Sequence, residues 1–249
     1  MSYFSSKIYI VLFLVGLSSS LHTAAFSLNS IQKTTDAINS NMHFLSLDEF
    51  SNLTAFPQQL ARFKQLQILS ANGNKITDIS MLSNLAQLKY LSISYSLVED
   101  IAPLQHLSHL QRLNLKGTKV TDTKVLSQLK DLVSLSLYAT KVHDLSPLTN
   151  LVKLQHLNLG YSLASDITPL ASLKQLRSLN LLWMPISDFS ALSQLSNLEH
   201  LDLSHTNFRN FELLLNMKHL KSLTLEMSQI TETSLLDDMV KNGLKINYR

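Results

Sequence analysis

The sequence repeats itself every 22 residues from Leu66 almost to its last residue. If the first leucine of each repeat is called position 0, eight successive repeats carry leucine at positions 0, 3 and 16, which in the first repeat are Leu66, Leu69 and Leu82. Position 19 is leucine in six repeats and methionine in the last two. A period of this length is typical of a solenoid, in which each copy packs mainly on its two neighbours.

Each repeat contains one alternating segment and one short turn. In residues 156–160 (His-Leu-Asn-Leu-Gly) two leucines alternate with outward positions, which predicts a short, half-buried strand. Positions 14 to 19 leave room only for a 3₁₀ turn or a short α turn. Because no copy can bury its leucines alone, we expect the strands to pair in one parallel sheet over a continuous leucine core.

Aspartate recurs at position 12 in six repeats, as Asp78, Asp100, Asp122, Asp144, Asp166 and Asp188. Such a row could indicate catalysis or metal binding, but each aspartate stands just before the outer turn, where a carboxylate accepts backbone N–H groups. We therefore interpret the row as turn and capping residues. Ser146 and Thr168 are further candidates for the cap, and Pro147 and Pro169 suit the first turn of a helix.

The frame LxxLxLxxTxVxDxxPLxxL is clearest in residues 132–151 and 154–173. It resembles the bacterial leucine-rich repeat of the internalin type, and the resemblance extends over residues 42–249. It implies an α/β leucine-rich-repeat solenoid, with a curved parallel sheet on the concave side and short 3₁₀ or α turns on the convex side. It also implies a protein-binding module, with bacterium–host contact as one use of its surface.

Position 8 departs from that family. There it usually carries asparagine, whose side chain bonds the turn of the next copy, whereas here only Asn74 is asparagine. The other repeats have Ser96, Thr118, Thr140, Ser162, Met184, Thr206 and Ser228. Hydroxyl groups can make a shorter version of that bond, and a methionine side chain cannot.

The N-terminal residues have a different character. Lys7 precedes an apolar run at residues 8–17, and Thr23 and Ala25 stand at the −3 and −1 positions of a cleavage site. This order predicts a signal peptide at residues 1–25 and a secreted, periplasmic or extracellular protein. The run is too short to cross a bilayer, which needs about 20 apolar residues. The alternative is an uncleaved anchor or a short N-terminal helix.

Polar, aperiodic residues 26–41 are interpreted as a spacer, and residues 42–249 as the array. The array needs capping units, which we place at residues 42–65 and 231–249. In the last unit the sequence predicts an amphipathic helix over residues 233–243 and a closing strand over 244–248. We expect its inward residues to be Leu236, Met239 and Val240, with Gly243 ending the helix.

Composition argues against several kinds of site. The net charge of +3, without a dense Lys/Arg run, argues against nucleic acid, and the absence of cysteine excludes disulfides and cysteine-based zinc sites. His156 and His200 share position 2 two copies apart, a separation of about 10 Å that is too long for one metal ion. No nucleophile-elbow or phosphate-binding glycine motif is present. We therefore expect no metal, no cofactor and no enzymatic activity.

Large side chains collect at the outward positions 2, 6 and 7, beside small polar groups at position 4. In a stacked sheet they would form a ridge along one rim of the concave face, and tyrosine, tryptophan and arginine are frequent in binding hot spots. The candidate protein-binding residues are Tyr95, Arg112, Tyr138, His156, Tyr161, Leu182, Trp183, Met184, His200 and His205. The alternative interpretation is a set of scattered surface aromatics.

Residues 182–185 (Leu-Trp-Met-Pro) are the strongest anomaly in this pattern and contain the only tryptophan. We expect Leu182, Trp183 and Met184 to be exposed as an anchor for a partner. The alternative places Trp183 in the core beneath the rim.

We therefore expect an exported, non-enzymatic protein that binds a protein or peptide on its concave face, without nucleic acid and without a membrane span in the mature chain. Two alternatives stay open. One is an intracellular effector or a phosphatase- or kinase-associated regulatory scaffold. The other is an envelope protein whose array is purely structural.

Overall fold

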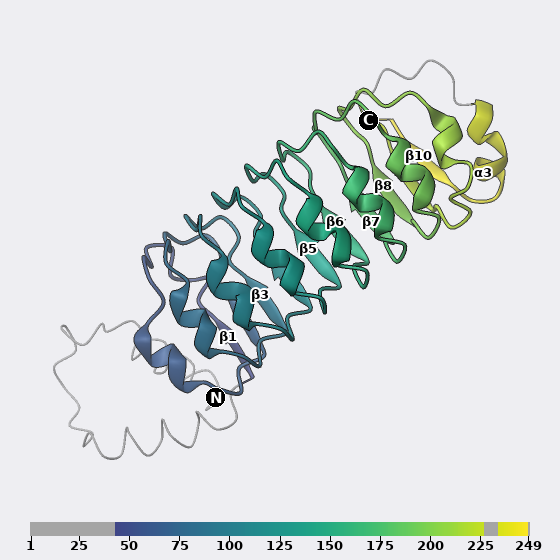
Figure 1. Ribbon diagram of the computed structural model, residues 1–249. Helices are drawn as coiled ribbons and strands as arrows, with labels where there is room; N and C mark the ends of the chain where they lie inside the picture. Colours follow the sequence, from purple (N-terminus) through teal and green to yellow (C-terminus); the bar gives the residue numbers. More distant parts are fainter. Residues whose placement is uncertain (1–42, 227–233, 249) are drawn as a thin grey trace, which may run out of the picture.

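The computed structural model describes residues 43–226 and 234–248, so the expected signal peptide and spacer lie outside the described residues. Ten three-residue strands form one parallel sheet in chain order (Figure 1). The strands are β1 Phe44–Ser46, β2 Ile68–Ser70, β3 Tyr90–Ser92, β4 Arg112–Asn114, β5 Ser134–Ser136, β6 His156–Asn158, β7 Ser178–Asn180, β8 His200–Asp202, β9 Ser222–Thr224 and β10 Lys245–Asn247.

The register of the sheet follows the sequence period. Leu157 at the centre of β6 lies between Leu135 of β5 and Leu179 of β7, and all three side chains are at most 2% exposed. Position 3 therefore forms one buried column of leucines through the array. Replacing a leucine in such a core by alanine costs about 2–5 kcal/mol. The solenoid with a single parallel sheet, predicted from the period, is confirmed.

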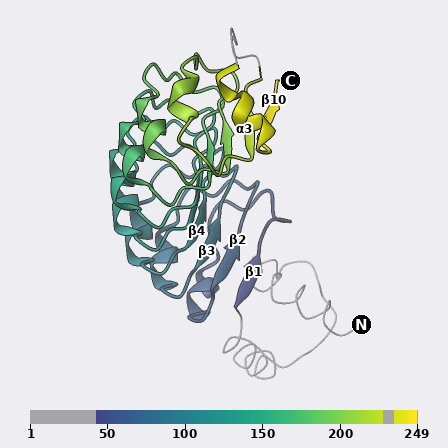
Figure 2. The same ribbon diagram turned by 90° about the vertical axis from the view of Figure 1, so that its right-hand side faces the viewer.

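Short 3₁₀ helices lie on the outer side of the arc, and the strands line its inner side (Figure 2). The helices are η1 Gln58–Arg62, η2 Ser80–Asn84, η3 Ala102–His106, η4 Lys124–Gln128, η5 Ser146–Asn150, η6 Thr168–Ser172, η7 Ser190–Gln194, η8 Phe211–Leu214 and η9 Ser234–Leu236, followed by the α-helix α3 Asp237–Lys241. Leucines at position 16, such as Leu148 of η5, are buried under these turns. The predicted short turns on the convex side are confirmed.

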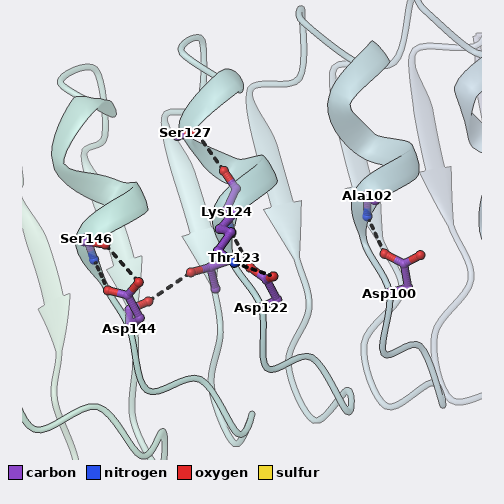
Figure 3. Close-up of polar contacts among 8 residues, drawn as sticks. All are labelled: Asp100, Ala102, Asp122, Thr123, Lys124, Ser127, Asp144 and Ser146. Carbon is purple, nitrogen blue, oxygen red and sulfur yellow. Dashed lines mark hydrogen bonds and ion pairs between the residues drawn. The ribbon is translucent and has the colours of Figure 1, made fainter.

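The aspartates at position 12 begin these outer turns, as predicted. In all six repeats the carboxylate accepts a 2.8 Å hydrogen bond from the backbone N–H two residues later, for example Asp144 from Ser146 (Figure 3). Ser146 and Thr168 are therefore not the caps, because their own N–H groups are two of the donors. The aspartate row has a structural role in starting each 3₁₀ helix.

Five of the side chains at position 8 donate a hydrogen bond within their own repeat: Asn74, Ser96, Thr118, Thr140 and Thr206. The Thr118 hydroxyl donates to the Leu115 carbonyl at 2.7 Å, and the Asn74 amide donates to the Ala71 carbonyl. The expected bond to the next copy is therefore wrong for Asn74. Among the buried side-chain polar atoms of the described residues, the Ser162 hydroxyl oxygen alone has no hydrogen-bond partner.

At the C-terminal end, the expected inward face of the last helix is partly wrong. Leu236 is fully buried and Met239 is partly buried against the core, but Val240 is 47% exposed. The helix α3 spans only five residues, and Leu236 is the residue directly before it. Leu236 and Met239, three residues apart, are the two side chains on the side that faces the core. Gly243 has a φ of +104°, and after it the chain enters β10, which pairs with β9.

Candidate functional site

The turn after each strand contains a residue in the left-handed backbone conformation. Position 7 has φ between +54° and +67° in seven successive repeats, as Gly73, Tyr95, Gly117, Ala139, Tyr161, Trp183 and His205. Stacking imposes this conformation, because the N–H at position 7 donates to the carbonyl at position 6 of the next repeat, as from Trp183 to Ser204 at 3.0 Å. Glycine adopts this conformation without strain, whereas an L-residue with a side chain adopts it at a cost of about 1–2 kcal/mol in conformational free energy.

Side chains from six successive repeats form a continuous row, which we call the aromatic row: Tyr95, Lys116, Tyr138, Tyr161, Trp183 and His205. The ring centroids of Tyr138 and Tyr161 are 5.3 Å apart in an edge-to-face contact. Trp183 stacks on Tyr161 at 6.1 Å and on His205 at 4.5 Å. The three largest exposures in the row are 56% for Tyr95, 51% for Trp183 and 44% for Tyr161.

Lys116 joins the first tyrosine of the row to the second. Its ammonium nitrogen lies 5.2 Å from the ring centroid of Tyr95 and 4.6 Å from that of Tyr138, which is cation–π geometry for both rings. A hydrogen bond with the Tyr95 hydroxyl raises the pKa of Lys116, and burial raises the pKa of Tyr138. Lys116 is absent from the residues selected on sequence, although its place at position 6 between two tyrosine-bearing repeats was a usable signal.

Two glycines make room for the row. A side chain at Gly117 would place its Cβ 2.6 Å from the Tyr95 ring, and one at Gly160 would come within 3.1 Å of the Tyr138 ring. Each tyrosine therefore lies against the backbone of the following repeat. Sequence reasoning missed these glycines, although each follows, one repeat later, a large side chain near position 7.

Small polar side chains at position 4 form a surface beside the row that we call the polar floor: Ser70, Ser92, Asn114, Ser136, Asn158, Asn180, Asp202 and Thr224. The polar floor supports the turns that carry the row. The side-chain oxygens of Asn158, Asn180 and Asp202 accept the backbone N–H two residues later, at 3.2, 3.0 and 3.0 Å. A Cβ on Gly160 would also come within 2.7 Å of the Asn180 side-chain oxygen. The floor and the row are therefore adjacent parts of one surface.

The expected exposure of residues 182–184 is confirmed at Trp183 and wrong at Met184. Trp183 is exposed, which excludes the alternative that places it in the core, and Leu182 is half-buried. Met184 is only 3% exposed. With residue 183 left-handed, the next side chain turns inward, to the place that holds a buried serine or threonine in most repeats. Met184 therefore cannot serve as an exposed contact.

The other selected residues lie at the opposite end of the strands. Arg112, His156 and His200 are exposed and begin β4, β6 and β8. Ser178 lies between the two histidines in the sheet pairing. The structure thus places these three on the same face as the floor, but it does not bring them into the aromatic row.

Two further features can be stated for residues 43–226 and 234–248. No group of three histidine, aspartate or glutamate side chains is placed to hold a metal ion. In the same ranges, no helix has the length and apolar character needed to span a membrane.

Comparison with known proteins agrees with the fold. Residues 64–106 match the family described as leucine rich repeats (2 copies). An internalin (inlF) of Listeria monocytogenes is 29% identical with a TM-score of 0.80, over 97% of this chain and 68% of its own. Internalin C2 (inlC2) of the same organism is 28% identical with a TM-score of 0.74, over 88% and 92%.

A leucine-rich-repeat protein of Leptospira interrogans shares the fold at 24% identity, with a TM-score of 0.68 over 80% of this chain and 58% of its own. A search of curated proteins gave no match. The repeat period, the ten-stranded sheet of the described residues and the family match lead to one conclusion: the chain is a leucine-rich-repeat solenoid, and it is similar in sequence and fold to two bacterial internalins.

Proposed function

We propose that the chain is a non-enzymatic binding module that holds a protein or peptide against the aromatic row and the polar floor. The observation that supports this most is the continuity of the row over six repeats. Strands about 4.8 Å apart give it a length of about 24 Å. Tyrosine and tryptophan are typical anchors of protein interfaces, because they combine a large apolar area with a polar tip.

The backbone of the row also favours a binding role. Tyr95, Tyr161, Trp183 and His205 occupy a left-handed position that Gly73 and Gly117 fill without strain. Each left-handed side chain lowers the free energy of unfolding by about 1–2 kcal/mol, and each contact between two rings raises it by only about 0.5–1.5 kcal/mol. Stability alone therefore gives little reason to prefer large rings there over glycine. Strained residues of this kind concentrate at functional sites.

Leu182, Arg112, His156 and His200 are proposed as outlying contacts. Leu182 follows the floor residue Asn180 and stays half-exposed beside the row. The other three lie on the same face at the start of their strands, so a partner that covers the floor reaches them. Each of these residues should contribute less to the binding free energy than Trp183, because contacts near the edge of an interface are usually weak.

Site-specific photo-cross-linking tests the proposed surface. A benzophenone-bearing amino acid in place of Trp183 should form a discrete adduct with the partner when cells that produce the protein are irradiated in their natural surroundings. The matched control replaces Leu215, which is 43% exposed beside η8 on the outer side of the array. The same adduct in equal yield from both sites, or no adduct from residue 183, would contradict the proposal. Sequencing the captured partner decides whether it is bacterial or from a host.

We further propose that the protein is exported after cleavage behind Ala25. The support is the order of Lys7, the apolar run and the small residues at the cleavage site. Mass spectrometry of the protein from fractionated cells should find Phe26 as the first residue. A cytoplasmic protein that keeps Met1 would overturn export and favour the regulatory-scaffold alternative, while leaving the binding surface itself open to the cross-linking test.

A further inference from the structure

The strand and turn segments that build the concave side have a one-sided charge. In six successive repeats, residues 67–76, 89–98, 111–120, 133–142, 155–164 and 177–186 contain no aspartate or glutamate. The same segments contain seven cations: Lys75, Lys89, Arg112, Lys116, Lys119, Lys141 and Arg177. Charge as such is therefore tolerated at these positions, and only negative charge is missing.

The acidic residues of these repeats lie elsewhere. Seven of them stand at positions 11 and 12, where the aspartates start the outer helices: Asp78, Glu99, Asp100, Asp122, Asp144, Asp166 and Asp188. Among the described residues, Arg177 alone of the seven cations is in an ion pair, 2.8 Å from Glu199. Arg112, on the face of the polar floor, and Lys116, in the row, therefore have no carboxylate partner among the described residues.

Acidic groups return at both ends of this surface. Asp48 follows β1 at one end, where it accepts hydrogen bonds from the Ser70 hydroxyl and the Asn72 N–H. At the other end, Glu199 and Asp202 belong to the repeat that carries His205. The acid-free surface thus runs from β2 to β7, a length of about 24 Å, which matches about seven residues of an extended chain.

Trp183 offers its edges rather than its faces. Trp183 is stacked on one side by Tyr161 and on the other by His205. The Lys116 ammonium lies over Tyr95 and over Tyr138. An aromatic ring is electropositive at its edge, so the exposed edges suit carbonyl and carboxylate oxygens. Nucleic-acid bases need a free ring face for stacking, and Trp183 does not provide one.

We infer that the partner of this surface is an acidic protein segment that lies along the array between β2 and β7, with carboxylates beside Arg112 and Lys116. The inference rests on the proposed function, because it names the partner class for the same surface. Complementary charge of this kind also steers association and fixes orientation.

A random display library tests the partner class without assuming a sequence. Peptides of about 12 residues, longer than the acid-free surface requires, are selected on the immobilised protein. Binders that also bind a Tyr161→Gly/Trp183→Gly variant are then removed. The remaining peptides should carry a mean net charge of about −2 or lower, against about zero for the unselected library.

One recovered peptide then provides the quantitative test. Lys116→Met keeps much of the packing between the tyrosines and removes the charge, so the dissociation constant should rise about tenfold at low salt. Arg112→Gln should act in the same direction. Lys130→Gln, an exposed lysine beyond η4 on the outer side, is the matched control and should leave the constant unchanged. Raising the salt from about 50 to about 300 mM should also weaken binding about tenfold.

The outcomes separate the two proposals. Neutral or basic peptides whose binding requires Trp183 would overturn the acidic partner and leave the binding function standing. A library that yields no peptide dependent on Trp183 and Tyr161 would overturn both. Tighter binding of an oligothymidine or of heparin, with a change in Trp183 fluorescence, would show that the cations serve a different class of polymer and would overturn the protein partner.

Discussion

Position 7 shows how one backbone requirement is met by different side chains. The stacked turn requires a positive φ at this position, and in the seven repeats the residue there is glycine, alanine, tyrosine, tryptophan or histidine. Gly73 and Gly117 have nearly equal φ values but different surroundings. Nothing would lie within 4 Å of a Cβ on Gly73, whereas a Cβ on Gly117 would meet the Tyr95 ring. The two sites therefore separate backbone strain from crowding by the row.

Gly73→Ala should lower the free energy of unfolding by about 1 kcal/mol, because only the left-handed backbone is penalised. Gly117→Ala should cost about 1–3 kcal/mol more, since the Tyr95 ring must also move. Urea denaturation followed by circular dichroism measures both. Equal losses for the two variants would mean that Tyr95 is not held against the backbone of the next repeat.

Residues 183 and 184 mark the limit of what pattern alone could predict at this scale. The exposure of Trp183 followed from its register in the repeat. The burial of Met184 did not, because the left-handed turn that directs it inward is signalled by glycine in only two of seven repeats. A methionine at a place usually filled by serine or threonine was therefore misinterpreted as a surface contact, when it fills the core.

At the scale of the repeat elements, the sequence predicted the strands, their register and the outer turns, because leucine spacing and recurring aspartates act locally and identically in every copy. For η5 and η6 it also offered Ser146 and Thr168 as caps beside the aspartates, and only the aspartates have that role, since serine, threonine and aspartate all suit the start of a helix. At the C-terminal end it placed Val240 inward, because a helical pattern there does not reveal that α3 is only five residues long.

Asp100→Ala should lower the free energy of unfolding by about 1 kcal/mol, because the Ala102 N–H at the start of η3 loses its acceptor. Asp100→Asn keeps an acceptor oxygen and should recover most of that loss. Glu99→Ala is the control at the neighbouring exposed residue. A loss from Glu99→Ala as large as that from Asp100→Ala would show that charge at this edge, rather than capping, supports the turn.

At the scale of the whole molecule, the caps and ion pairs make stability depend on pH. Hydrogen bonds from Ser80, Ser146 and Thr168 hold the pKa values of Asp78, Asp144 and Asp166 below their usual range. Bonds from Lys221 and Arg177 lower the pKa of Glu199. A carboxyl with a lowered folded-state pKa stabilises the fold above its unfolded-state pKa, near 4, and loses that effect as the pH falls through the folded value.

The urea midpoint should therefore fall between about pH 5 and about pH 3 as these carboxylates become protonated. Asp144→Asn keeps an acceptor oxygen but cannot titrate, so its midpoint should fall less over the same range. A midpoint that rises toward low pH, or an equal slope in the variant, would show that these carboxylates do not stabilise the array.

The central claim is that the aromatic row serves binding and that the array does not need it for stability. The most direct test is the free energy of unfolding of a Tyr161→Gly/Trp183→Gly/His205→Gly variant, measured by urea denaturation with circular dichroism. Loss of the ring contacts and relief of three left-handed side chains should nearly cancel, leaving the variant within about 2 kcal/mol of the natural protein. A loss above about 4 kcal/mol would show that the row is part of the structural core and contradict the claim.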